Sequence, residues 1–200
     1  MQPVYHSKPA KIESRLVVVD AYRSLTGNHS IPRNKSYWCL CNYQPNVVGA
    51  EIVDLVRCGL LSKSQFYGVD NDAEVIEYNK EQHEDANWLY GDWLTVCRNN
   101  YQAFSSASLI FYDGIRSVVN KQEAKYIARS MDIAPSGVVF VVNLMLANPY
   151  SGESYDPNQF HKLIQSSLIN PNEWAYLPEY YSYTSSHAEM ATYFFQKFLS

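Results

Sequence analysis

Three aspartates, Asp70, Asp92 and Asp113, end or closely follow short apolar runs, and their side chains are the best placed in this sequence to do chemistry. In open α/β sheets, ligands bind beyond the carboxyl ends of the strands, where an acidic side chain accepts hydrogen bonds from ribose hydroxyls. Asp70 has the strongest signal, because an apolar run beginning at Phe66 ends on it and a helical run, Ala73–Gln82, follows at once. We therefore predict a nucleotide-type ligand at Asp70.

Asp70 has a second interpretation, as the N-cap of the helix that follows, because aspartate is a preferred N-cap residue. Asp72 lies two positions later and is at least as suitable a cap. We therefore predict that Asp72 caps the helix, which leaves Asp70 and its neighbour Asn71 for the ligand.

A second strand–loop–helix unit lies upstream of this one. Residues 37–42 are predicted to form a strand, residues 43–49 a loop and residues 50–58 a helix. Asp70 follows Gly49 by 21 residues, close to the roughly 20 expected between a nucleotide-binding turn and its ribose-binding acid. Glu51 lies in the first turn of this helix. Besides a cofactor contact, it has the alternative role of a carboxylate that stabilises the helix dipole. The candidate cofactor contacts in this unit are Cys41, Asn42, Tyr43, Gly49 and Glu51.

The elements around these units alternate between strands and helices. An amphipathic helix is predicted over residues 8–25, ahead of the first strand. Continuous apolar strands bounded by turns are typical of a parallel sheet covered on both faces. Beyond the two units, the predicted strands are residues 87–90, 108–113 and 137–146, and the predicted helices are residues 120–131 and 157–168.

The end of the sequence has a different character. Residues 179–185 and 190–198 alternate as two strands, and their short connection requires them to be antiparallel. We therefore predict an α/β fold: a doubly wound, mostly parallel sheet of about seven strands with helices on both faces and a C-terminal antiparallel β-hairpin. A single domain is expected, with residues 1–35 as an N-terminal helix and loop and residues 36–200 as a Rossmann-like domain.

Composition suits one globular domain, because 46% of the 200 residues are hydrophobic and 18% are charged. The net charge of −4 divides into +4 over residues 1–36, with six Lys or Arg against two Asp or Glu, and −8 over the rest. The basic N-terminal segment makes contact with nucleic acid a hypothesis, although solvated helix charges are the simpler interpretation.

Other kinds of chemistry lack their motifs. The four cysteines include no CxxC pair and the histidines are not grouped, so neither a metal site nor a thiol redox centre is predicted. The absence of Gly-x-x-x-x-Gly-Lys and G-x-S-x-G patterns argues against P-loop phosphoryl transfer and an α/β-hydrolase triad. The sequence has no signal-peptide layout and no apolar run of about 18 residues, so we expect a soluble, cytoplasmic protein.

The whole pattern resembles the class I S-adenosylmethionine-dependent methyltransferases. The resemblance covers most of the sequence from residue 36 onward, including the terminal hairpin and the turn at residues 134–137. The features that carry it are the strand–loop–helix at Trp38–Glu51, Gly68-Val69-Asp70, Gly91-Asp92-Trp93 and Asp113.

The resemblance implies a Rossmann-like methyltransferase domain with S-adenosyl-L-methionine (SAM) as cofactor. It implies that Asp70 holds the ribose hydroxyls and that Asp92 and Trp93 lie beside the adenine. It also implies that Asp113, with its neighbour Tyr112, faces the methyl acceptor and orients or deprotonates it. Asp92 and Asp113 each have the alternative role of capping a turn. Trp93 has the alternative role of a core residue.

The first loop departs from the family, which has a glycine-rich loop that lets the backbone approach the methionine part of the cofactor. Residues 42–49 contain a single glycine, although Asn42 tolerates unusual backbone angles. A cofactor-binding or interaction protein without turnover is therefore the alternative function, and a nicotinamide-dependent oxidoreductase, lacking its G-x-G-x-x-G turn, is a further one. In the family, an Asn-Pro-Pro-Tyr-type signature at this strand marks methylation of amino nitrogens on bases. Residues 112–115 lack it, which argues against DNA adenine or cytosine as the acceptor. A small molecule, a protein and RNA are the acceptors left open.

Overall fold

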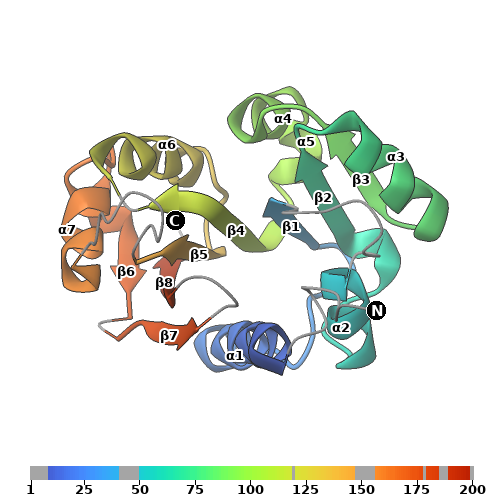
Figure 1. The fold of residues 1–200 in the computed structure, drawn as a ribbon, viewed down its shortest axis with the longest axis horizontal. Coiled ribbons are helices and arrows are strands. Elements are labelled where there is room, and N and C mark those ends of the chain that lie inside the picture. The colour runs from blue at the N-terminus through green and yellow to red at the C-terminus, as the bar shows by residue number, and fades with distance from the viewer. Residues whose placement is uncertain are drawn as a thin grey trace.

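The computed structural model describes residues 9–40, 50–118, 120–146, 156–177, 179–184 and 189–198, which form one central sheet with helices around it (Figure 1). The described residues include the single-turn 3-10 helices η2 (Lys63–Gln65), η3 (Pro157–Gln159) and η4 (Pro171–Glu173). In chain order the other elements are α1 (Pro9–Thr26), β1 (Ser36–Leu40), α2 (Ala50–Arg57), β2 (Phe66–Asp70), α3 (Ala73–Gln82), β3 (Asn87–Tyr90), α4 (Trp93–Asn99), α5 (Tyr101–Phe104), β4 (Ala107–Val118), α6 (Lys121–Asp132), β5 (Val139–Met145), α7 (Phe160–Gln165), β6 (Trp174–Tyr176), β7 (Tyr181–Thr184) and β8 (Glu189–Lys197).

The sheet is mostly parallel and has the strand order β3-β2-β1-β4-β5-β8-β6, with β7 also paired to β8. Strands β1 to β5 run parallel to one another, whereas β8 runs antiparallel to β5, β6 and β7. β6 pairs with residues 195–197 and β7 with residues 189–192 of the same edge of β8, so these eight strands fill seven positions. The predicted doubly wound sheet with a closing antiparallel hairpin is confirmed.

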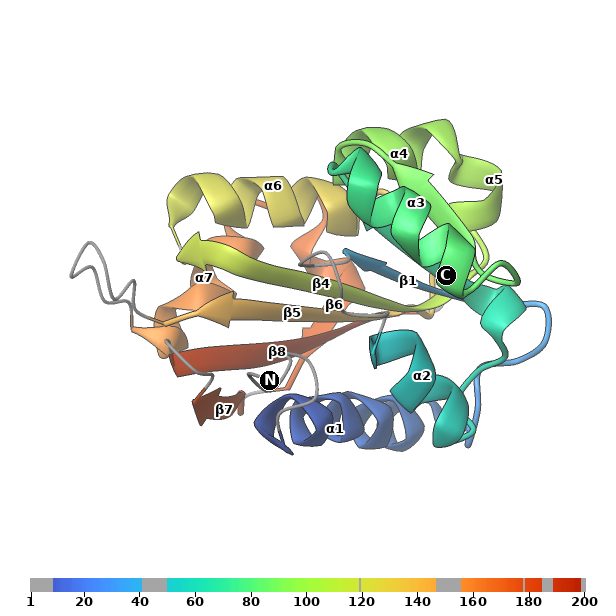
Figure 2. The same cartoon turned by 45° about the vertical axis from the view of Figure 1, so that its right-hand side comes forward.

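Helices cover both faces of the sheet, as predicted (Figure 2). On one face, α1 and α2 pack into the core through Tyr22 and Ile52, both fully buried. On the other face, α6 packs through Ile127, also fully buried. Side chains alternate along a strand, so Phe111 of β4 joins the first cluster and Ile110 joins the second. Burial on both faces is the physical reason that the central strands are apolar along their length.

Element bounds differ from the sequence predictions in several places. β4 continues to Val118 rather than ending at Asp113, because it pairs with β5 beyond that point, with a shift of register after Gly114. Residues 93–104, for which no element was predicted, form α4 and α5. The predicted helix over residues 157–168 is η3 followed by the six residues of α7, and β6 is an unpredicted strand.

α1 is attached to α2 by an ion pair in which Arg15 Nη1 lies 2.6 Å from Asp54 Oδ2. Arg23, further along α1, donates hydrogen bonds to the backbone carbonyls of His29 and Cys58. Two basic side chains of the N-terminal segment are therefore engaged within the protein. α1 is 18 residues long, and neither it nor any other helix in the described ranges has the length and apolarity needed to cross a bilayer.

Candidate functional site

Asp70 is the last residue of β2 and lies at the carboxyl edge of the sheet, with 8% of the residue exposed. Its Oδ1 accepts a hydrogen bond from the backbone N–H of Asp72 at 2.9 Å, which orients the carboxylate. Asp72 is the N-cap of α3 and accepts from the backbone N–H of Glu74 at 2.9 Å. The prediction that Asp72 caps this helix is confirmed. Asn71, between the two aspartates, is exposed.

Gly91 brings the end of β3 to the same edge, because its N–H donates to the carbonyl oxygen of Asp70 at 2.8 Å. Gly91 has a φ of +139°, and a Cβ at this position would lie 3.0 Å from Val96 Cγ2. A glycine is therefore required where the chain leaves β3 and enters α4. The turn therefore brings Asp92 close to Asp70 through a backbone hydrogen bond of Gly91.

Asp92 is the N-cap of α4 and is exposed. Its Oδ1 accepts from the N–H and the hydroxyl of Thr95 at 3.0 and 2.9 Å, and its Oδ2 accepts from the Tyr126 hydroxyl at 2.6 Å. Partial burial alone raises the pKa of Asp92, but these hydrogen bonds outweigh it and hold the pKa below its usual value. The capping interpretation is confirmed. The contact of Asp92 with an adenine stays a prediction. A carboxylate has roughly four acceptor positions, so these hydrogen bonds leave room for one from a ligand.

Trp93 lies in the core, with 2% of the residue exposed. Its Nε1 donates to Ser130 Oγ of α6 at 3.2 Å, and its ring packs edge-on against Phe104 and Tyr112. The structure therefore matches the core interpretation of this residue. A side chain buried to this extent offers no open ring face on which an adenine could stack.

Tyr112 and Asp113 are adjacent in β4, so their side chains point to opposite faces of the sheet. The Tyr112 hydroxyl donates to Glu123 Oε1 of α6 at 2.7 Å. Burial, reinforced by the Glu123 carboxylate, raises the pKa of Tyr112 far above its ordinary value. Asp113 is 8% exposed and accepts at Oδ1 from Asn143 Nδ2 at 2.6 Å. The two predicted catalytic residues therefore do not share a face, and Asp113 caps no turn because β4 continues past it.

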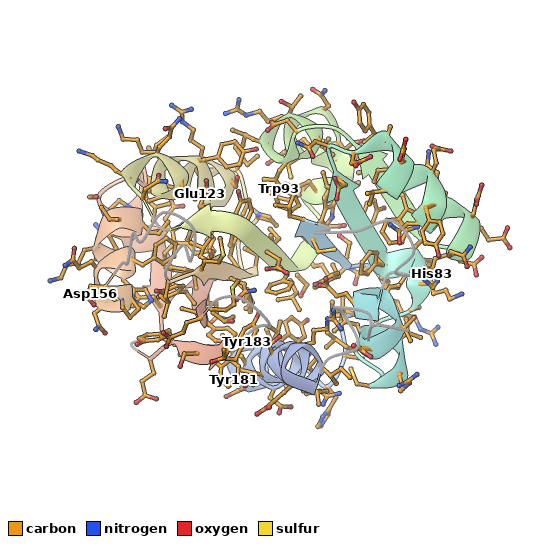
Figure 3. All side chains as sticks on the ribbon, in the orientation of Figure 1. His83, Trp93, Glu123, Asp156, Tyr181 and Tyr183 are labelled. Carbon is orange, nitrogen blue, oxygen red and sulfur yellow. The ribbon has the colours of Figure 1, made fainter. Side chains whose placement is uncertain are left out.

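Asn143 of β5 connects Asp113 to the antiparallel end of the sheet. Its Nδ2 also donates to the Tyr183 hydroxyl at 2.9 Å, and its Oδ1 accepts from Thr192 Oγ1 at 3.0 Å. Figure 3 shows Tyr183 with Tyr181 beside α1, away from Trp93 and Glu123. This network was not predicted from the sequence. Its one available signal is an asparagine within the apolar strand β5.

Glu51 lies in the first turn of α2 and accepts a hydrogen bond from the Tyr37 hydroxyl of β1. This contact attaches the start of α2 to the sheet, in addition to the favourable position of a carboxylate at a helix N-terminus. The other candidates of the first unit lie outside the described residues, and their contact with a cofactor stays a prediction. They are Cys41, Asn42, Tyr43 and Gly49.

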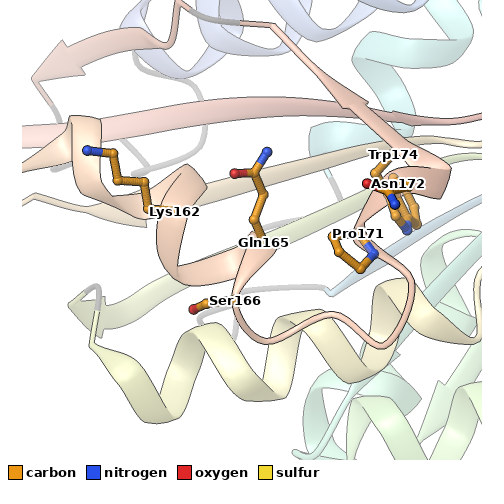
Figure 4. A pocket seen from close by; sticks show the side chains of 6 residues that line it. All are labelled: Lys162, Gln165, Ser166, Pro171, Asn172 and Trp174. Carbon is orange, nitrogen blue, oxygen red and sulfur yellow. The ribbon is translucent and has the colours of Figure 1, made fainter.

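An open pocket lies between α7 and the turn that precedes β6 (Figure 4). Because β1, β4, β5 and β8 lie between β6 and β2, the strand that ends on Asp70, this pocket is separate from Asp70. Within the described ranges, no three His, Cys, Asp or Glu side chains gather as a metal site, and Cys58 and Cys97 form no disulfide. The pocket is lined by Lys162, Gln165, Ser166, Pro171, Asn172 and Trp174.

No family model matches the sequence, and no curated protein matches it. Solved structures do match. The N-methyltransferase NodS from Bradyrhizobium japonicum WM9 has a TM-score of 0.63 at 11% identity, covering 96% of this chain and 99% of NodS. The O-methyltransferase from Bacillus cereus, in complex with S-adenosylhomocysteine (SAH), has a TM-score of 0.62 at 11% identity, covering 98% of this chain and 84% of that enzyme.

Two further matches are longer proteins. SMU.776, whose crystal structure contains SAH, has a TM-score of 0.61 at 12% identity over 88% of this chain. The chain spans only 48% of SMU.776 and 57% of the carbon methyltransferase CurJ. At such identities the similarity establishes the fold and leaves activity and substrate to be argued from the site.

Proposed function

We propose that this chain, which has the class I methyltransferase-like fold, binds SAM and transfers its methyl group to an acceptor. The observation that carries the proposal is the position of Asp70, a mostly buried carboxylate at the end of β2 in a sheet whose β8 is antiparallel. Ligands of doubly wound sheets bind at this edge, and a carboxylate there accepts from ribose hydroxyls.

The residues at the edge fit the nucleoside part of the cofactor. Asp70 is an acceptor-only group when ionised, and ribose offers two hydroxyl donors. Asp92 is exposed and ionised, which suits the exocyclic amino group of an adenine. The B. cereus enzyme and SMU.776 contain SAH, the product form of SAM, in their crystal structures. These observations support SAM as the cofactor of this chain.

The transfer step depends mainly on alignment of the acceptor. Bound SAM supplies a methyl group on a sulfonium, which is an electrophile. Asp113 is the residue of this chain proposed to orient the acceptor or take its proton, a task for which Asn143 holds Oδ1 in one position. Tyr112 faces α6 and hydrogen-bonds Glu123, so we assign it no catalytic part.

The acceptor is proposed only as a class: a small molecule, a protein or RNA. A nucleic-acid acceptor would draw on the basic N-terminal segment, in which Arg33 is exposed while Arg15 and Arg23 have partners within the protein. A cofactor-binding protein without turnover remains the second candidate, because the glycine-poor loop at residues 42–49 departs from the family.

Isothermal titration calorimetry with SAM, SAH and NAD tests the proposal. We expect binding of SAM and SAH and no measurable heat with NAD. Binding of NAD alone would replace the proposal by the nicotinamide oxidoreductase. Binding of SAM without methyl transfer to RNA, protein or small-molecule fractions, followed with labelled cofactor, would favour the binding protein.

A further inference from the structure

Tyr126 of α6 makes two hydrogen bonds at the start of α4. Its hydroxyl donates to Asp92 Oδ2 at 2.6 Å and accepts from the backbone N–H of Leu94 at 3.2 Å. Tyr126 therefore satisfies one of the open N–H groups of the helix and holds the capping carboxylate at the same time. The contact joins residues 34 positions apart in the sequence.

The charges of the pair make this arrangement stable. Burial and the hydrogen bond to Asp92 raise the pKa of Tyr126, so its hydroxyl keeps its proton and remains a donor near neutral pH. The pKa of Asp92 is lowered, so the carboxylate remains an anion. A neutral donor facing an anionic acceptor gives a charge-assisted hydrogen bond, which is short and about twice as strong as a neutral one.

The two oxygens of the Asp92 carboxylate have different hydrogen-bond partners. Oδ1 accepts two donors, both from Thr95, whereas Oδ2 accepts the Tyr126 hydroxyl. Each carboxylate oxygen accommodates about two hydrogen bonds. Oδ2 is therefore the oxygen with capacity for a ligand donor, and its direction is set by Tyr126.

We propose that Tyr126 is a positioning residue that fixes Asp92 Oδ2 to accept from the exocyclic amino group of the cofactor base. This inference rests on the proposed function. Through Asp92, Tyr126 makes the site selective for a 6-amino purine over a 6-oxo purine, which would place an acceptor oxygen opposite the carboxylate. Tyr126 itself does not touch the ligand.

The test compares SAH with S-inosylhomocysteine, the analogue that carries hypoxanthine in place of adenine, by calorimetry. For the wild type we expect a preference for SAH of about tenfold or more, the scale of one hydrogen bond to a charged group. Tyr126→Phe removes only the hydroxyl, and we expect the preference to shrink to about threefold or less.

Ser130→Ala is the matched control. Ser130 accepts from Trp93 Nε1 and donates to the backbone carbonyl oxygen of Tyr126, so this variant removes a contact between α6 and α4 while the Tyr126 hydroxyl and its bond to Asp92 stay in place. We expect it to keep the wild-type preference for SAH. If Tyr126 has a purely structural role, Tyr126→Phe will lower the affinity for both ligands by the same factor and leave the preference for SAH unchanged. That result would overturn the inference.

The remaining outcomes separate the inference from the proposed function. Wild-type protein that binds neither ligand contradicts the proposed function. Wild-type protein that binds both equally keeps the proposed function and overturns the inference, because Asp92 would then not read the amino group. If Tyr126→Phe does not fold, Asp92→Asn puts an amide nitrogen where the proposed acceptor oxygen Oδ2 lies and keeps an oxygen to accept from Thr95. An unchanged preference for SAH in that variant would overturn the inference, because Asp92 would then not accept from the amino group.

Discussion

Asn143 Nδ2 of β5 donates a 2.6 Å hydrogen bond to Asp113 Oδ1 of the neighbouring strand β4. The two residues lie opposite each other in the parallel register, so the bond fixes the carboxylate in mid-strand. Its partner amide is itself held by Tyr183 and Thr192. The carboxylate proposed to meet the acceptor is therefore set by the sheet, not by a turn.

Asp70→Asn is expected to weaken binding of SAH by about tenfold or more, because the anionic acceptor for the ribose hydroxyls is lost. Asparagine keeps an oxygen that accepts from the Asp72 N–H, so the melting temperature of the ligand-free protein should change little. Calorimetry and thermal unfolding measure the two quantities.

Asp72→Ala is the control for Asp70→Asn. It removes the N-cap of α3 and should cost about 1 kcal/mol of unfolding free energy, with little effect on affinity. Unchanged SAH affinity in Asp70→Asn, with a loss of affinity in Asp72→Ala, would show that the two aspartates have been assigned the wrong way round.

Asp113→Asn is expected to leave SAH affinity almost unchanged and to lower the rate of methyl transfer by about 10²-fold, the scale typical of a lost general base. The assay follows an acceptor identified by screening fractions with labelled cofactor. Tyr112→Phe, on the opposite face of the sheet, is the control and should transfer at close to the wild-type rate. Equal rates for all three proteins would remove Asp113 from the mechanism.

Gly91→Ala is expected to destabilise the protein by about 1–3 kcal/mol, because alanine strains a backbone at positive φ. The added methyl would also lie 3.0 Å from Val96 Cγ2. Gly59 also has positive φ, +72°, but nothing lies within 4 Å of the position that a Cβ would take there, so Gly59→Ala should cost less. Urea unfolding compares the two variants, and a larger loss for Gly59→Ala would contradict the steric argument.

Stability should fall as pH drops below about 6.5, the ordinary histidine pKa. Burial, and for His83 also the positive charge of Lys63, lowers the pKa of His83, and burial lowers that of His161. A lowered histidine pKa means that the unfolded chain binds protons first, so stability is full above the unfolded pKa and is lost as pH falls towards the folded one.

His161→Phe tests this linkage, because His161 is packed against Tyr176, Tyr193 and Phe195 and its Nε2 has no hydrogen-bond partner in the described part of the protein. The variant should reduce the loss of unfolding free energy between pH 7 and about 5.5 while keeping the ring packing. An identical pH dependence in variant and wild type would show that His161 does not contribute.

The sequence by itself determined the local units of this protein. β2 and β3 have the predicted bounds, and Asp72 caps α3, because apolar runs and capping residues act over only a few positions. The position of Asp70 at the end of β2 follows from the same local pattern. The parallel order and the closing hairpin could also be predicted, because connection lengths constrain how neighbouring strands pair.

Only the tertiary structure decided which side chains hold the candidate site. Tyr126 reaches Asp92 across 34 residues and Asn143 reaches Asp113 across 30. Trp93 is in the core because α6 packs over α4, and β4 extends beyond Asp113 because β5 continues beside it. Such contacts depend on the packing of helices and strands far apart in the sequence, whereas periodicity and capping report only on the residues within one element.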